Sequence, residues 1–88
     1  PTTGCMPMVG EAFPFYKVRQ IEVEKTTMAE IREMFGEPWR TGLENGERTW
    51  TYGEYGVKLS RDLVIRYDDR NVVKSYSFSS SEPEDANL

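Results

Sequence analysis

The chain has 88 residues, a formal net charge of −4, a single cysteine and no histidine. This length allows one small domain, and an aromatic content of 12% favours a folded core over a disordered chain. The negative charge argues against nucleic-acid binding, because clustered Lys and Arg are needed to neutralise phosphates. Without histidine the chain lacks the usual Cys/His zinc site and any Cys–His or Ser–His nucleophile pair. We therefore expect no metal, no cofactor and no enzymatic activity.

The first fourteen residues are interrupted repeatedly by proline and glycine and show no hydrophobic periodicity. This pattern predicts a flexible N-terminal tether over residues 1–14. No apolar run in the chain approaches the ~18 residues of a transmembrane helix.

Residues 15–23 support two interpretations. Val18 and Ile21 lie three residues apart, which suits a short helix opened by Pro14. Ile21 and Val23 alternate with charged residues, which suits a strand. We favour a short helix over residues 15–21.

The clearest local signal predicts a second helix over Met28–Phe35. Thr27 and Glu30 form a capping box, in which each side chain bonds the backbone N–H of the other residue. The apolar residues of the segment recur at helical spacing. Gly36 suits the left-handed backbone just past a helix end, and Pro38 prevents continuation.

After this helix the hydrophobic period changes to two, which predicts strands. Asn45-Gly46 is a strong two-residue hairpin signal between residues 39–44 and 47–52. In the second of these strands Trp50 and Tyr52 share a face.

The remaining segments complete an antiparallel meander. Residues 53–56 are interpreted as a loop or bulge, and residues 59–67 as a strand with one mostly apolar face. Residues 68–71 form a turn, because Asp and Asn bond or tolerate turn backbone. Residues 72–79 are the last strand, and residues 80–88 a disordered polar tail.

The faces of the last strand are ambiguous. Val72, Tyr76 and Phe78 fall on one face, and Val73 falls with three serines on the other. The whole pattern predicts an α+β domain over residues 15–79. Two short N-terminal helices pack on an antiparallel sheet of three to four strands.

Several short motifs in a fixed order carry a family resemblance over residues 13–78. They are Ile21-x-x-x-Lys25-Thr26-Thr27-x-x-x-Ile31-x-x-x-Phe35-Gly36-x-Pro38, Asn45-Gly46, Trp50-x-Tyr52 and Asp68-x-x-Asn71-x-Val73. Their order and spacing resemble the SmpA/OmlA (BamE-like) family of bacterial envelope lipoproteins. The resemblance implies a non-enzymatic, lipid-anchored domain on the periplasmic face of a bacterial membrane, with the outer membrane expected. Its implied role is to scaffold or stabilise envelope protein assembly by protein–protein binding.

Two positions near the N-terminus take their meaning from this resemblance. Thr3-Gly4-Cys5 resembles the end of a lipobox, so Cys5 is the candidate lipidation site, although Thr2 stands where the family usually has an aliphatic residue. The alternative is an incidental free cysteine. Glu24 replaces a glycine that is usual in the family, and we expect it to take an ordinary backbone conformation.

The aromatic residues supply the candidate partner-binding surface. Trp50 and Tyr52 are candidates, but a covered sheet face is the favoured interpretation for both. Trp, Tyr and Arg dominate binding hot spots. Trp39 and Arg40 lie at the junction of helix and sheet and Tyr55 lies in the expected loop nearby, so these three are better candidates for an exposed binding surface. Replacing Trp39 and Arg40 by alanine is predicted to weaken partner capture with little change in melting temperature.

Two classes of function therefore remain open. The first is the lipid-anchored assembly domain, whose partner is an envelope or outer-membrane assembly protein. The second is a soluble inhibitor or adaptor that occludes a target enzyme. In either class the chain is a monomer or a dimer, because an exposed edge strand favours pairing or swapping.

Overall fold

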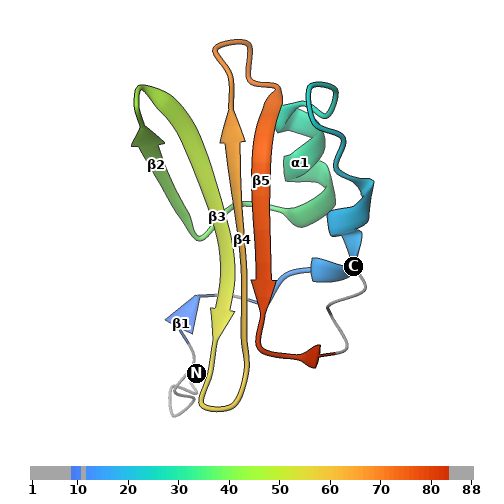
Figure 1. Cartoon of the computed structure of the whole chain (residues 1–88), viewed down its shortest axis with the longest axis vertical. Coiled ribbons are helices and arrows are strands. Elements are labelled where there is room, and N and C mark those ends of the chain that lie inside the picture. The colour runs from blue at the N-terminus through green and yellow to red at the C-terminus, as the bar shows by residue number, and fades with distance from the viewer. Residues whose placement is uncertain (1–8, 11, 84–88) are drawn as a thin grey trace.

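The structure is a computed structural model that describes residues 9–10 and 12–83. It shows an antiparallel sheet with short helical segments against one face, which confirms the α+β class (Figure 1). The elements are β1 (Val9–Gly10), the 3-10 helix η1 (Phe15–Gln20), α1 (Met28–Phe35), β2 (Arg40–Glu44), β3 (Glu47–Tyr55), β4 (Ser60–Tyr67) and β5 (Val73–Ser80). Within the described residues, no helix has the length and apolar character needed to cross a membrane.

The ordered part of the chain begins earlier than residue 15. The two residues of β1 pair with the end of β3, with Val9 opposite Tyr55. Phe13 is only 8% exposed and belongs to the core. The segment that the sequence assigns to the tether therefore contributes both a strand and a core residue. Cys5 lies outside the described residues.

Helix α1 begins and ends where its local signals predict. The backbone N–H of Glu30 donates to Thr27 Oγ1 at 3.2 Å, and the N–H of Thr27 donates to Glu30 Oε1 at 2.9 Å. At the other end Gly36 has φ +82° and its N–H donates to the carbonyl of Arg32. Both ends are set by contacts within four residues, so the sequence alone is sufficient to place them.

The connection before α1 corrects one expectation. Glu24 has φ +69°, the left-handed backbone conformation that glycine adopts easily. Its N–H donates to the carbonyl of Val73 at 2.7 Å, and the N–H of Val73 donates to the carbonyl of Thr26. This backbone pairing with the start of β5 holds the connection in place, so the expected ordinary conformation of Glu24 is wrong.

The β2–β3 hairpin is confirmed, but β3 is longer than expected. Asn45 and Gly46 have φ +54° and +84°, as a type I′ turn requires. Beyond Tyr52 the strand continues to Tyr55, with Gly53 opposite Asp62. The interpretation of residues 53–56 as a loop or bulge is therefore wrong for 53–55, because pairing with β4 keeps this segment extended.

A register shift in β5 resolves the ambiguity about its faces. The pairs are Leu63 with Phe78, Ile65 with Tyr76, Arg66 with Ser75 and Tyr67 with Val73. The shift at Arg66 and Tyr67 places one extra residue in β5, so Val73 joins Tyr76 and Phe78 on the buried side. The expected grouping of Val72 with Tyr76 and Phe78 is therefore wrong.

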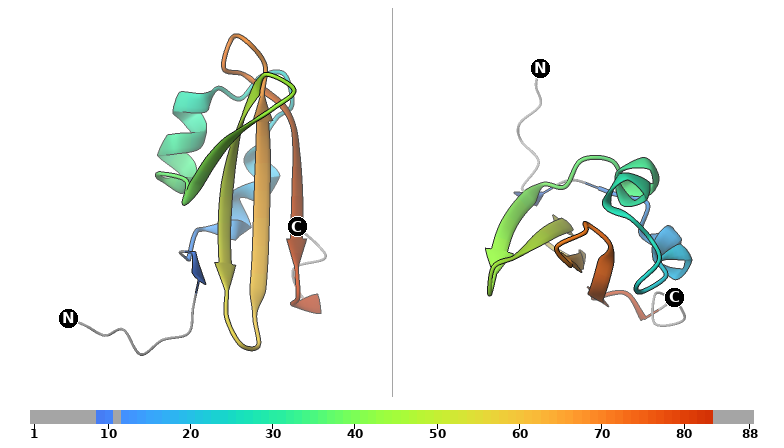
Figure 2. Two further views of the ribbon diagram at one scale, coloured as in Figure 1. Left: turned by 90° about the vertical axis from the view of Figure 1, so that its left-hand side faces the viewer. Right: turned by 90° about the horizontal axis from the view of Figure 1, so that it is seen from above.

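The helical segments and one face of the sheet enclose the hydrophobic core, and the opposite sheet face is left uncovered by helices (Figure 2). The buried hydrophobic residues are Phe13, Val18, Ile21, Ile31, Phe35, Trp50, Tyr52, Leu63, Ile65, Tyr67 and Val73. At one end of the core face Glu54 and Arg61 form an ion pair at 3.5 Å. The guanidinium of Arg61 lies 3.7 Å from the ring centre of Phe15, which ties η1 to the sheet.

Candidate functional site

The structure separates the five candidate partner-binding residues between the two faces of the sheet. Trp50 is 5% exposed and Tyr52 is 2% exposed, and both belong to the core under α1. A side chain enclosed by the core is not available to a partner. Trp50 and Tyr52 are therefore removed from the candidate site, in agreement with the covered-face interpretation.

The other three candidates come together. The rings of Trp39 and Tyr55 meet edge to face, with 6.0 Å between their centres. The guanidinium carbon of Arg40 lies 5.1 Å from the centre of the Trp39 ring. Asp62, in β4, accepts a hydrogen bond from the hydroxyl of Tyr55. We call Trp39, Arg40, Tyr55 and Asp62 the Trp39 cluster.

The strands position this cluster. The backbone N–H of Trp39 donates to the carbonyl of Thr51 at 3.1 Å, which fixes the residue at the entry to β2. Tyr55 and Asp62 alternate with core-facing neighbours, so their side chains lie on the uncovered face. Gly53 lies beneath the ring of Tyr55, where a Cβ would be 2.7 Å from ring carbon Cε2. Only glycine leaves room for this ring.

Burial and the hydrogen bond to Asp62 set the protonation of Tyr55. Burial is the larger cause, and together with Asp62 it raises the pKa of the Tyr55 phenol to about 12. The phenol therefore remains a neutral hydrogen-bond donor at neutral pH. Trp39 Nε1 is buried and has no hydrogen-bond partner among the described residues. The Trp39 N–H also acts on the Tyr55 phenol, whose pKa it lowers, so this buried donor is directed at the hydroxyl of the cluster itself.

Asp62 is the one member of the cluster that the sequence analysis missed. It lies in β4 among alternating polar residues and carries no motif. Its role depends on the register of β3 and β4, which places Asp62 opposite Gly53. If β3 is predicted to continue to Tyr55, its pairing with β4 places Asp62 close to Tyr55.

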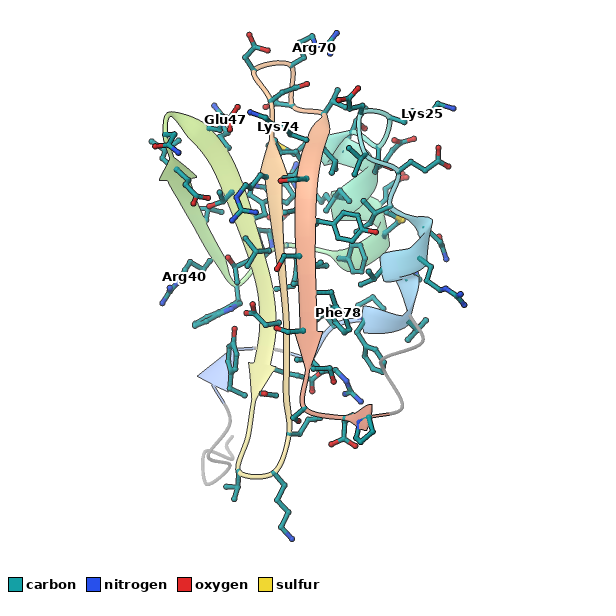
Figure 3. All side chains as sticks on the ribbon, viewed as in Figure 1. Lys25, Arg40, Glu47, Arg70, Lys74 and Phe78 are labelled. Carbon is teal, nitrogen blue, oxygen red and sulfur yellow. The ribbon has the colours of Figure 1, made fainter. Side chains whose placement is uncertain are left out.

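The rest of the uncovered face is mostly hydrophilic, with Val64 as an apolar residue between Thr51 and Ser77. Glu44 pairs with Arg66 at 2.7 Å, and Glu47 pairs with Lys74 at 2.6 Å (Figure 3). Serine and threonine fill the positions between these ion pairs. The Trp39 cluster is thus an aromatic and cationic site beside a polar surface. Among the described residues, no group of three or more His, Cys, Asp or Glu side chains could hold a metal ion.

Comparison of the chain with protein-family models, curated proteins and solved structures finds no match.

Proposed function

We propose that this chain is a non-enzymatic binding domain that scaffolds or stabilises envelope protein assembly from a lipid anchor. The observation that carries the proposal is the Trp39 cluster. An indole, a guanidinium and a phenol meet at the edge of a face that is otherwise mostly polar. These are the residue types that supply most of the energy in protein–protein contacts.

The chemistry of the cluster supports binding better than catalysis. The raised pKa of Tyr55 keeps its phenol neutral, and the Asp62 carboxylate is already engaged by that phenol. The chain has no histidine to serve as a base. What the cluster offers a partner is the exposed part of a half-buried indole and the exposed Arg40.

The anchoring part of the proposal rests on the resemblance of Thr3-Gly4-Cys5 to a lipobox. Acyl chains contribute ~0.8 kcal/mol per buried CH₂, and two or more are needed for stable anchoring. An anchored domain meets membrane partners at a raised effective concentration. A modest binding surface would then be sufficient for function.

Site-specific photocrosslinking in intact cells tests the proposal. A photoreactive residue replaces Arg40 in one strain and the exposed Arg19 of η1 in a matched control strain. We expect a crosslink to an envelope protein from position 40 only, and loss of that crosslink when Trp39 is changed to alanine. Mass spectrometry of membrane-extracted protein is expected to show acyl chains on Cys5.

Two results would contradict the proposal. An unmodified Cys5 in a freely secreted product that crosslinks to one soluble enzyme would support the inhibitor or adaptor class instead. Equal crosslinking from positions 19 and 40 would show that the Trp39 cluster is not the binding surface. Thermal unfolding of each variant separates loss of binding from loss of fold, because Trp39 is half-buried and Arg40 is exposed.

A further inference from the structure

Strand β2 is an open edge of the sheet. It pairs with β3 on one side, and no other described strand pairs with it (Figure 1). All five of its residues are exposed, and Leu43 is 74% exposed. The edge of β5 is different at its start, where Glu24 and Thr26 exchange backbone hydrogen bonds with Val73. An edge such as β2 offers unpaired backbone groups to another strand.

The sequence of β2 is complementary to itself. It reads Arg40-Thr41-Gly42-Leu43-Glu44, with a positive residue and a negative residue at equal distances from a central glycine. An antiparallel pair of two such strands centred on Gly42 places Arg40 of each copy opposite Glu44 of the other. Opposite charges in directly facing positions stabilise a strand pair, whereas like charges destabilise it.

The backbone directions agree with this register. A two-residue type I′ hairpin closes on a hydrogen-bonded pair, here Glu44 with Glu47, and such pairs alternate along an antiparallel ladder. The backbone groups of Arg40, Gly42 and Glu44 therefore point toward β3. Those of Thr41 and Leu43 point toward the open edge. The register centred on Gly42 places Thr41 of one copy opposite Leu43 of the other, which allows four hydrogen bonds across the pair.

We propose that two copies of this chain pair through β2, antiparallel and centred on Gly42, to form one continuous sheet. Such a symmetric contact uses the same patch on both copies. Gly42 carries no side chain at the close approach on the axis. Leu43 of one copy is a diagonal neighbour of Leu43 of the other on the helix-covered side, within reach of long side chains. The ion pair with Arg66 already restrains Glu44 on the opposite side.

The expected dimer is weak. Two five-residue strands bury less than the ~1,200 Å² of a standard stable interface. Association should therefore depend strongly on concentration, and confinement on a membrane would favour it. The inference goes beyond the proposed function, because it concerns self-association and does not require lipidation or an envelope partner.

Reversing the charge of Arg40 or Glu44 tests the strand register centred on Gly42. Dimerisation is measured by sedimentation velocity in low salt, from low micromolar to millimolar protein. Every variant also carries Cys5→Ser, which prevents disulfide dimers. Arg40→Glu alone and Glu44→Arg alone each place like charges opposite one another. We expect each to weaken dimerisation by about tenfold, since two facing pairs change from attraction to repulsion. An equimolar mixture of the two single variants should form a heterodimer, because every facing pair is then opposite in sign.

A double variant with Arg40→Glu and Glu44→Arg is the matched control, because the strand is again complementary to itself and dimerisation should return. Thr41→Pro removes an amide that points to the open edge and should abolish dimerisation without removing a β2–β3 hydrogen bond. Circular dichroism verifies that each variant is folded. A reference chain that carries only Cys5→Ser and stays monomeric at millimolar concentration, or a dimer whose stability does not change with the charge reversals, would overturn the proposal. The double variant also lacks Arg40 in the Trp39 cluster, so it separates dimerisation from partner capture.

Discussion

The hydroxyl of Tyr52 donates a 2.7 Å hydrogen bond to the carbonyl of Gly36. Tyr52 lies on the core face of β3, and Gly36 is the C-terminal cap of α1. The bond joins the end of the helix to the sheet and satisfies a carbonyl near the helix end, where intrahelical partners run out. Burial, assisted by the charge of Glu37, raises the pKa of the Tyr52 phenol, which therefore remains a donor.

The hydroxyl of Tyr67, unlike that of Tyr52, is buried without a hydrogen-bond partner among the described residues. Removing these two hydroxyls is therefore predicted to change the free energy of unfolding in opposite directions. The side chain of Tyr67 is fully buried against Trp50. Tyr67→Phe removes an unsatisfied polar group and should raise the free energy of unfolding by about 1 kcal/mol. Tyr52→Phe removes a made bond and should lower it by about 1 kcal/mol. Urea unfolding followed by tryptophan fluorescence measures both. A loss of stability in both variants would contradict the assignment for Tyr67.

The close approach of Tyr55 to Gly53 gives a second prediction. Gly53→Ala places a methyl group where the Tyr55 ring lies, so the ring must move and its hydrogen bond to Asp62 must break. We expect a loss of about 1–3 kcal/mol in the free energy of unfolding, as for other overpacked sites.

A double-mutant cycle isolates the cause. In a Tyr55→Ala background the same Gly53→Ala change should cost much less, because the ring is gone. Equal costs in the two backgrounds would place the effect in the backbone of β3 and not in the Tyr55 contact.

The parts of this fold that follow from the sequence are those set by neighbours in the chain. The boundaries of α1 depend on Thr27, Glu30 and Gly36, and the hairpin turn depends on Asn45-Gly46. The parts of the fold that differ from the prediction are set by residues far away in the chain. β3 continues past Tyr52 because β4 pairs with it, and the faces of β5 follow a register shift that leaves no composition signal.

The candidate site divides in the same way. Residue type, together with a place at the helix-to-sheet junction or in an expected loop, selected Trp39, Arg40 and Tyr55. It could not decide which face of β3 is covered, so Trp50 entered the same candidate set although it lies in the core. Asp62 enters the site only through cross-strand pairing with Gly53.

The left-handed conformation of Glu24 gives a third prediction. A non-glycine residue with positive φ carries a backbone cost of roughly 1–2 kcal/mol. Glycine removes that cost but loses about 0.5–1 kcal/mol through the entropy of the unfolded chain. Glu24→Gly should therefore raise the free energy of unfolding by up to about 1.5 kcal/mol. Glu24→Ala, which removes the charge but keeps the Cβ, should give no such gain. If both variants gain equally, the carboxylate and not the backbone is responsible.

The β4–β5 turn gives a prediction about pH. Asp68 Oδ1 accepts hydrogen bonds from the backbone N–H groups of Val72 and Arg70, at 3.1 and 2.8 Å. These bonds, that from Val72 above all, hold the pKa of Asp68 below its usual value of 3.8. A carboxyl whose pKa is lower in the folded state stabilises the fold above its unfolded pKa, and this contribution is lost as the pH falls through the folded pKa.

Asp68→Asn should therefore be less stable than the wild type at pH 7, and the difference should shrink below about pH 4 as the wild-type carboxyl protonates. Urea unfolding at pH values from 7 to 2 measures this difference. Asp69→Asn is the matched control, since it removes a charge from the exposed neighbouring position in the same turn. A difference between wild type and Asp68→Asn that stays constant down to pH 2 would show that the two backbone bonds do not depend on the charge of Asp68.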